Sequence, residues 1–343
     1  MFCSHLFVTL QAISIKPDKM RKILFLLVLF ALTSVSADAQ FLFRVSGNRL
    51  KKPSYLFGTI HTLPGSLLDS TPSYQKAEAK CQQLFAEMDF TDQQKRDEFI
   101  NSGQEALMLP DSMTIYDILT PEQLELLKIV LAKEFKEMTL ARTTDEEAKA
   151  KMTDEMFYMT AEASLEQMKH LMPLAFSTTI DLLIGTSFAS IPSTIIDKAC
   201  IERAMERNMA IGQLDQVQQD SLAKFRETLM HNIPAQVDTI MKVLNTYEER
   251  KQKAVEQKHF FEKCQEYWEA SDYESFVRLC DETAFIEKSP QLLKARNEKW
   301  IPKIKEAMKE CPTMFVFGAG HLVGPSGVVQ MLRDAGYKVK QIK

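Results

Sequence analysis

Two short segments near opposite ends of the chain share one pattern, which constrains the fold more than any other feature of the sequence. Each is a run of aromatic and branched residues that ends in Phe-Gly-x-x-His: Ser54-Tyr-Leu-Phe-Gly-Thr-Ile-His61 and Thr313-Met-Phe-Val-Phe-Gly-Ala-Gly-His321. Such runs are typical of strands, and a strand that breaks at a glycine delivers the next side chains to the carboxyl edge of its sheet. Because the chain has only six histidines, the repeat predicts that His61 and His321 meet in one site.

A carboxylate follows a third apolar run. Helical spacing over 73–83 leads into a predicted strand over 84–88, and Glu87 stands near the end of that strand. Side chains of a strand alternate between its faces, so Glu87 and Asp89 share one face if the strand continues that far. A lone acid is ordinarily a solvated surface group. Its place at the end of an apolar run counts against that interpretation of Glu87.

Two imidazoles and one carboxylate from strand ends form a plausible donor set for a divalent metal ion. Three protein ligands leave positions open, and water bound to such an ion attacks carbonyl groups near neutral pH. Glu87 could be a metal ligand or the general base, and the sequence does not separate these roles. A His and carboxylate set admits zinc, manganese, cobalt or iron. The chain has no Cys-x-x-Cys motif, so no thiolate zinc site and no thioredoxin-type centre is indicated.

In this order, the motifs resemble the TraB/PrgY/GumN superfamily, and in particular its GumN-like branch, which is related to the Tiki metalloproteases. The resemblance runs from about residue 43 to the C-terminus and is carried by Gly58-Thr-Ile-His61, Gly318-Ala-Gly-His321, Glu87, the pair Arg296-Asn297 and the tail 320–327. It implies an α/β fold of the EreA/ChaN-like type, with a mixed central sheet built from N- and C-terminal segments. It also implies a metal site of His61, His321 and Glu87, and among Mn, Co and Zn it favours manganese or cobalt.

The resemblance extends to residues around this set. Arg296 would stabilise an oxyanion or hold a substrate carboxylate, and Asn297, Asp89 and Asp197 are candidates for groups that support the ligands. The alternative for Arg296-Asn297 is a surface ion pair or a helix cap. Two positions depart from the family pattern. Asp197 lacks the adjacent glycine, and Asp215 stands where family members have Leu-Glu, which leaves a role for Asp215 open.

Helices dominate the middle of the chain. Residues from about 92 to 190 are predicted to form a large helical insertion in a domain spanning 40–343, and Thr120-Pro-Glu-Gln123 is a capping box with proline at the first helical position. The Met- and Phe-rich stretch 152–176 is most simply helix core; the alternative is an adaptable apolar lid or peptide-binding surface over the site. The remaining predictions are helices over 195–207, 218–310 and 328–335, and strands over 209–214 and 337–342.

Residues 1–39 are predicted to be an upstream extension followed by a signal peptide. Met20-Arg-Lys precedes a ten-residue apolar run over 23–32, and Ala37-Asp-Ala39 provides an A-x-A cleavage site. The run is shorter than the stretch of about 20 residues that crosses a bilayer. We therefore expect a mature protein that begins near Gln40 and is exported to the periplasm or secreted, with no stable membrane anchor after cleavage.

The composition of the chain limits the classes of partner that it can bind. A chain with 45% apolar residues can build a full core, and a net charge of −4 with dispersed basic residues gives no electrostatic footprint for nucleic acid. Besides Cys3 in the leader, five cysteines remain, and an odd number leaves at least one unpaired within the chain. By sequence separation, Cys264 and Cys280 are the favoured pair.

The sequence thus favours an exported metal-dependent hydrolase that acts on a peptide or protein. Two alternatives come from other classes: an extracytoplasmic protein that binds a haem-like ligand, and an interaction protein with a non-catalytic site. Haem binding would give a Soret band, whereas hydrolysis would need a divalent ion and be lost with a chelator. A non-catalytic site would show neither.

Overall fold

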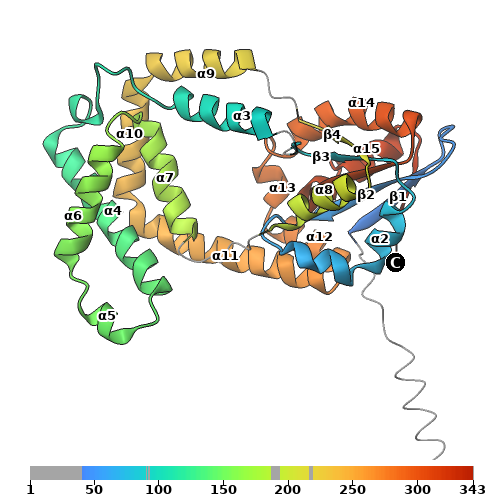
Figure 1. Cartoon of the computed structure of the whole chain (residues 1–343), viewed down its shortest axis with the longest axis horizontal. Coiled ribbons are helices and arrows are strands. Elements are labelled where there is room, and N and C mark those ends of the chain that lie inside the picture. Colours follow the sequence, from blue (N-terminus) through green and yellow to red (C-terminus); the bar gives the residue numbers. More distant parts are fainter. Residues whose placement is uncertain (1–40, 90, 92, 187–193, 216–218, 343) are drawn as a thin grey trace, which may run out of the picture.

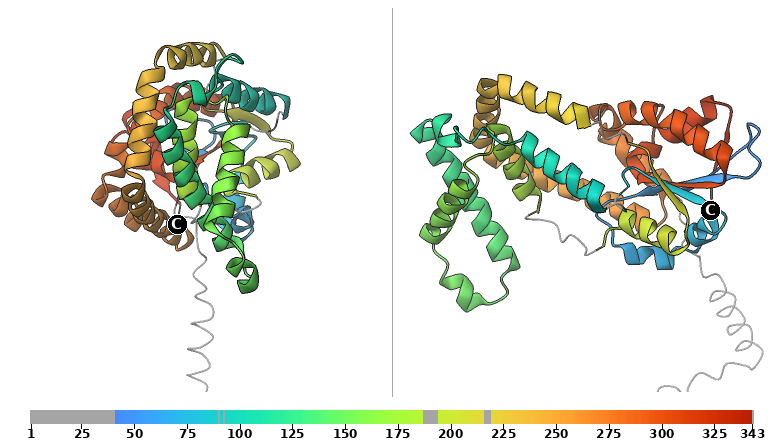
Figure 2. Two further views of the ribbon diagram at one scale, coloured as in Figure 1. Left: turned by 90° about the vertical axis from the view of Figure 1, so that its left-hand side faces the viewer. Right: turned by 45° about the horizontal axis from the view of Figure 1, so that its top comes forward.

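The computed structural model of the chain describes residues 41–89, 91, 93–186, 194–215 and 219–342. The predicted leader, 1–39, lies outside this part. The molecule is elongated and has two lobes at opposite ends of its long axis, one built around a β-sheet and one made of helices (Figures 1 and 2). Among the helices of the described residues, none combines the length and apolar character needed to cross a membrane.

Within the described residues, six strands form one mixed sheet in the order β4-β3-β5-β2-β1-β6. Strands β2, β5, β3 and β4 are mutually parallel, and β1 is antiparallel to both of its neighbours. The predicted α/β fold with a sheet drawn from both ends of the chain is confirmed. The strands are β1 (Leu42–Ser46), β2 (Ser54–Thr59), β3 (Gln83–Ala86), β4 (Ala210–Gln213), β5 (Thr313–Gly318) and β6 (Lys338–Gln341).

Both faces of the sheet are covered, which explains why the central strands read as continuous apolar runs. Along β5, Met314 and Val316 enter one buried cluster, while Phe315 and Phe317 enter the other. The first cluster is closed by α2 (Pro72–Glu78), α8 (Ile196–Glu206), the end of α11 (Tyr247–Glu269) and α12 (Tyr273–Glu282). The second is closed by α14 (Lys294–Glu310) and α15 (Val328–Asp334).

The helical lobe has a buried core of its own, formed by leucine, isoleucine, valine and aromatic side chains. Its helix α4 (Pro121–Arg142) begins as predicted, with Thr120 and Gln123 forming a capping box around Pro121. The lobe comprises α4, α5 (Glu146–Ala150), α6 (Asp154–Gln167), α7 (Pro173–Thr186) and α10 (Ile233–Asn245). Three helices run between the lobes: α3 (Gln93–Ala106), α9 (Gln219–His231) and α11 (Figure 1).

Two separate segments of the chain build this lobe. The insertion predicted over 92–190 is only the first of them. The chain leaves the sheet after β3, returns for α8 and β4, and leaves again through α9 and α10, whose residues Ile240 and Val243 join the lobe core. The Met- and Phe-rich stretch is split between core and surface, since Phe157 and Phe176 are buried while Met159 is 62% exposed. Helix α6 lies at the end of the lobe remote from the sheet, so it does not form a lid over the sheet edge (Figure 1).

Helix α11 connects the two cores. Its first turn packs in the helical lobe through Tyr247, and its last turn packs against the sheet through Trp268. Its middle, 252–259, is mostly exposed, as expected of a helix that crosses solvent between two lobes. The indole N–H of Trp268 donates a 2.8 Å hydrogen bond to the backbone carbonyl of Gly58, so α11 is tied to the backbone of the first Gly-x-x-His segment.

The predicted Cys264–Cys280 disulfide is wrong, because both thiols are free and buried. They lie on the packed helices α11 and α12 within one apolar cluster. Burial raises the pKa of each thiol to about 12, so both stay protonated near neutral pH. Sequence separation does not determine the Cβ geometry that a disulfide requires.

Candidate active site

The two Gly-x-x-His segments leave the sheet at the same edge. Strands β2 and β5 are parallel neighbours, and their last residues, Thr59 and Gly318, are paired in register. The carboxyl ends of parallel strands lie at one edge, so His61 and His321 follow from adjacent points. Strand β3 flanks β5 on the other side and ends at Ala86, which places Glu87 immediately beyond the strand.

Glu87 lies between the two histidines. Its Oε1 atom is 3.8 Å from Nε2 of His61 and 3.8 Å from Nε2 of His321. The same oxygen accepts a 2.7 Å hydrogen bond from the backbone N–H of Gly318. A Cβ atom at Gly318 would lie 3.0 Å from Nε2 of His61, so the second-motif glycine makes room for the first-motif histidine. The three side chains singled out by the sequence pattern thus lie together at one edge of the sheet.

Each imidazole is oriented through its other nitrogen. Nδ1 of His61 donates to Asp197 at 3.0 Å, and the second oxygen of Asp197 accepts from the Thr59 hydroxyl at 2.7 Å. Nδ1 of His321 lies 2.6 Å from Oδ1 of Asn297, which is buried. With the protons on Nδ1, both Nε2 atoms carry lone pairs on the side of Glu87. Hydrogen bonds of this kind fix the tautomer and ring direction of metal-binding histidines.

Arg296 completes the cluster. Its Nη2 forms an ion pair with Glu87 and bonds Oδ2 of Asp215 at 2.6 Å, while its Nε donates to Oδ1 of Asp215 at 3.3 Å. Its Nη1 lies 3.3 Å from Nε2 of His321. The guanidinium carbon lies 4.7 Å from the ring centroid of Trp300, whose indole N–H donates to Asp215 at 2.7 Å. The arginine is thus held by two carboxylates and one aromatic face.

The two histidines differ in environment. The His61 side chain is 57% exposed, and its pKa is raised, chiefly by the hydrogen bond to Asp197, with burial opposing. The His321 side chain is 3% exposed, and burial together with the charge of Arg296 lowers its pKa to about 3. His321 is therefore a neutral imidazole throughout the physiological range. Burial disfavours the charge of Arg296, but Asp215 and Glu87 outweigh it and raise the pKa of the guanidinium.

The cluster resembles a metal site in donor chemistry but is not a closed one. Bonds from an ion to imidazole nitrogen or carboxylate oxygen are about 2.0–2.2 Å long, so two such ligands on one ion lie within about 4.4 Å of each other. The 3.8 Å separations of Glu87 from both histidines meet this limit. In the described part of the chain, however, no group of three or more His, Cys, Asp and Glu side chains could hold a metal ion as arranged. The guanidinium of Arg296 contacts two members of the set.

Not every predicted site residue joins the cluster. Asp89 was expected on the face of Glu87, but β3 ends at Ala86 and the alternation stops there. The Asp89 carboxylate instead accepts hydrogen bonds from the backbone and hydroxyl of Thr91. Asp197 and Asn297 lie where the resemblance suggested, each behind one imidazole. The sequence left open a role for Asp215, which the structure shows to be the main anchor of Arg296.

Two contributors were missed by sequence reasoning. Thr59 orients Asp197, and its position two residues before His61 was the available signal. Trp300 packs on Arg296 and on His321, whose ring centroid is 4.3 Å away. Trp300 lies four residues after Arg296, one helical turn along α14, and that spacing places both on one face of the helix.

The model of the TraB/PrgY/gumN family matches residues 41–341, which is nearly all of the described chain. The protein belongs to the TraB/PrgY/gumN family. Comparison with curated proteins and with solved structures gave no match. The matched region spans both lobes, so membership in the TraB/PrgY/gumN family applies to the helical lobe as well as to the sheet.

In this TraB/PrgY/gumN protein an apolar surface borders the second motif. A Cβ atom at Gly320 would lie 3.3 Å from the ring of Phe285, the first residue of the short helix α13 (Phe285–Lys288). The ring centroids of Phe285 and Phe260 are 5.1 Å apart. Phe261, which follows Phe260 on α11, is 48% exposed. Polar groups at the strand ends and apolar groups beside them form the usual composition of a binding site.

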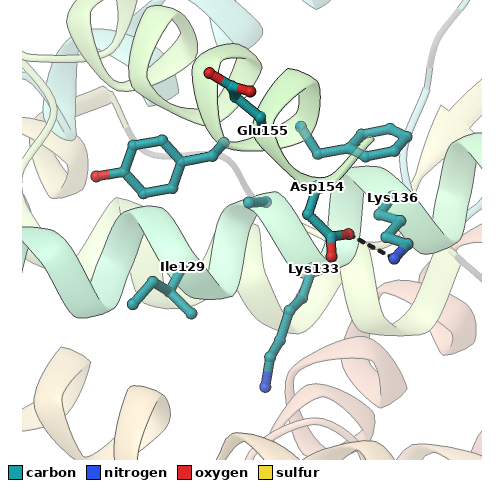
Figure 3. A pocket seen from close by; sticks show the side chains of 8 residues that line it. Ile129, Lys133, Lys136, Asp154 and Glu155 are labelled. Atoms are coloured by element: carbon teal, nitrogen blue, oxygen red, sulfur yellow. Dashed lines mark hydrogen bonds and ion pairs between the residues drawn. The ribbon is translucent and has the colours of Figure 1, made fainter. Parts of the chain in front are cut away.

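A hollow lies far from this cluster, in the helical lobe. It has a volume of about 480 Å³ between α4 and α6, and Figure 3 shows the Lys136–Asp154 ion pair of 2.5 Å at its wall. Its lining comprises Ile129, Ala132, Lys133, Lys136, Asp154, Glu155, Phe157 and Tyr158. Neither Gly-x-x-His motif contributes a residue to it.

Proposed function

We propose that this member of the TraB/PrgY/gumN family is an exported metal-dependent hydrolase that cleaves amide bonds in peptides or proteins. One observation carries the proposal: two imidazoles present their Nε2 atoms to one oxygen of Glu87, each turned that way by a hydrogen bond on Nδ1. An ordinary surface ion pair would not require that Asp197 and Asn297 fix the orientation of the His61 and His321 rings through Nδ1.

His61, His321 and Glu87 are the residues that would hold the ion, with manganese, cobalt or zinc as candidates. A divalent ion in such a set supplies a Lewis acid and makes water acidic enough to attack a carbonyl group. Asp197 and Asn297 would hold the imidazoles in place. His321 is suited to ligation because its pKa of about 3 leaves Nε2 unprotonated in the physiological range.

Two further residues would act on the substrate. Glu87 has an oxygen near both imidazoles and can accept the proton of the attacking water. Arg296 carries a fixed positive charge beside Glu87 and can stabilise the negative charge that develops on the carbonyl oxygen. The apolar surface around Phe285 and Phe261 would take a neighbouring side chain of a peptide, which favours a peptide over a small polar substrate.

The test is metal analysis and activity measured together. Mature protein is exposed to manganese, cobalt or zinc, desalted, and compared with His61→Ala, His321→Ala and Glu87→Gln. Activity is followed on a defined peptide mixture by mass spectrometry. We expect wild-type protein to retain about one ion, and each variant to lose roughly a hundredfold or more in cleavage. His231→Ala, which removes an exposed histidine from α9, is the matched control and should change neither quantity.

Glu87→Gln separates the two roles of this acid. An ion retained with cleavage lost identifies Glu87 as the base, whereas loss of both identifies it as a ligand. A wild-type protein that retains no ion from any of the three metals, and cleaves nothing, would refute the hydrolase proposal.

A further inference from the structure

We propose that the guanidinium of Arg296 competes with a divalent cation for Glu87 and His321, so that this arginine weakens ion binding at the site. The inference rests on the proposed function, because it concerns the ion assigned there. It adds that the affinity of the site is limited by a residue that contributes no ligand atom.

The contacts of Arg296 are with the donor atoms themselves. Its Nη2 is paired with Oε2 of Glu87, and its Nη1 lies 3.3 Å from Nε2 of His321. The Nδ1 atom of His321 is engaged with Asn297, so Nε2 holds the one lone pair of that ring. One lone pair cannot accept a hydrogen bond from Arg296 and bind an ion at the same time. Ligation by His321 therefore requires that this contact be broken.

Breaking that contact does not remove the positive charge. Asp215 holds Arg296 through Nε at 3.3 Å and through Nη2 at 2.6 Å, and neither bond involves Nη1. Trp300 covers the guanidinium and fixes Asp215 in turn. The arginine side chain is only 24% exposed, so its charge is incompletely screened by solvent. The cation stays next to the donor set and repels a second cation there.

The contacts of Arg296 also explain why His61, His321 and Glu87 do not form a closed metal site. Removing Arg296 frees the His321 lone pair, releases Oε2 of Glu87 from its ion pair, and removes the repulsion. All three changes favour a divalent ion. If Arg296 instead served mainly to orient Glu87 for ligation, its removal would weaken ion binding.

The experiment is titration calorimetry with manganese, cobalt and zinc chloride on metal-free mature protein. Arg296→Met removes the charge and keeps the length of the side chain, while Lys299→Met removes an exposed charge from the same helix. We expect Arg296→Met to lower the dissociation constant by about tenfold or more, and Lys299→Met to change it by less than about twofold.

A second comparison covers the case in which Arg296→Met leaves the partly buried Asp215 without its cationic partner and fails to fold. The double variant Arg296→Met with Asp215→Asn removes both charges and is compared with Asp215→Asn alone. Here too the variant without arginine should bind the ion about tenfold more tightly.

The outcomes are separable. Wild-type protein that binds an ion, with an Arg296→Met variant that binds equally or more weakly, would overturn the competition while leaving the hydrolase proposal standing. Wild-type protein without a measurable ion beside a variant that binds one would support the competition and count against the hydrolase. Absence of binding in both would refute both proposals.

Discussion

The buried imidazole of His321 should make the sheet lobe unstable in acid. Its pKa is lowered from 6.5 to about 3, because burial and the charge of Arg296 disfavour its protonated form. In the unfolded chain the same group has its ordinary pKa. A lowered folded-state pKa gives stability that is complete above pH 6.5 and is lost progressively as the pH falls towards 3.

The size of the effect follows from the two pKa values. At about pH 4.5, roughly two units below the unfolded pKa, the unfolded chain binds nearly one proton at this position and the folded chain almost none. Since one pKa unit corresponds to about 1.4 kcal/mol, the free energy of unfolding should fall by about 2–3 kcal/mol between about pH 7.5 and 4.5 through His321 alone. His321→Asn keeps a donor towards Asn297 and cannot titrate, so this contribution should disappear.

The chain offers a suitable probe. Both of its tryptophans, Trp268 and Trp300, lie in the cores of the sheet lobe, so their fluorescence reports that lobe without interference from the helical one. Urea unfolding is followed in the presence of a chelator at several pH values. His231→Asn, on α9, is the control and should retain the wild-type slope. If wild-type protein and His321→Asn show the same dependence on pH between about 6.5 and 4.5, the assignment of His321 as a permanently neutral group is wrong.

Two other predictions concern the first motif. Asp197→Asn removes the carboxylate whose hydrogen bond raises the pKa of His61, so the His61 titration seen by NMR should move to lower pH, and an unchanged midpoint would contradict this. Gly58→Ala should destabilise the protein by about 1–3 kcal/mol, because its Cβ would lie 2.5 Å from Leu322. Gly185→Ala on α7 is the control, since a Cβ there meets no atom within 4 Å and should not destabilise the protein in the same urea experiment.

Much of the site could be predicted because it depends on strand ends. A strand buried on both sides shows as an apolar run, and a glycine and a histidine after it are placed by the strand itself. For this reason the sequence pattern places His61 and His321 at one edge of the sheet, and the resemblance to the TraB/PrgY/GumN superfamily adds Glu87. Arg296 and Asn297 also come from that resemblance, because the superfamily has an Arg-Asn pair in the helix before the last motif strand.

Other contacts between side chains could not be predicted from the ends of strands. Asp215 and Arg296 are 81 residues apart, and their contact depends on how α14 lies across the end of β4. Asp89 was misplaced because the predicted alternation continued beyond the last strand residue, Ala86. The second helical segment of the lobe was not separated from the long helical region 218–310, since an amphipathic pattern shows that a helix is buried on one side but not which core receives it.

The route of the chain through the two lobes has a consequence for variation. The helical segments depart after β3 and after β4, which are parallel neighbours, so both departures are from the edge that carries Glu87 and Asp215. Insertions and replacements in those segments alter the surroundings of this edge without passing through a strand or changing its register. Changes of length or sequence in the helical lobe can therefore leave the positions of Glu87 and Asp215 at the sheet edge unchanged.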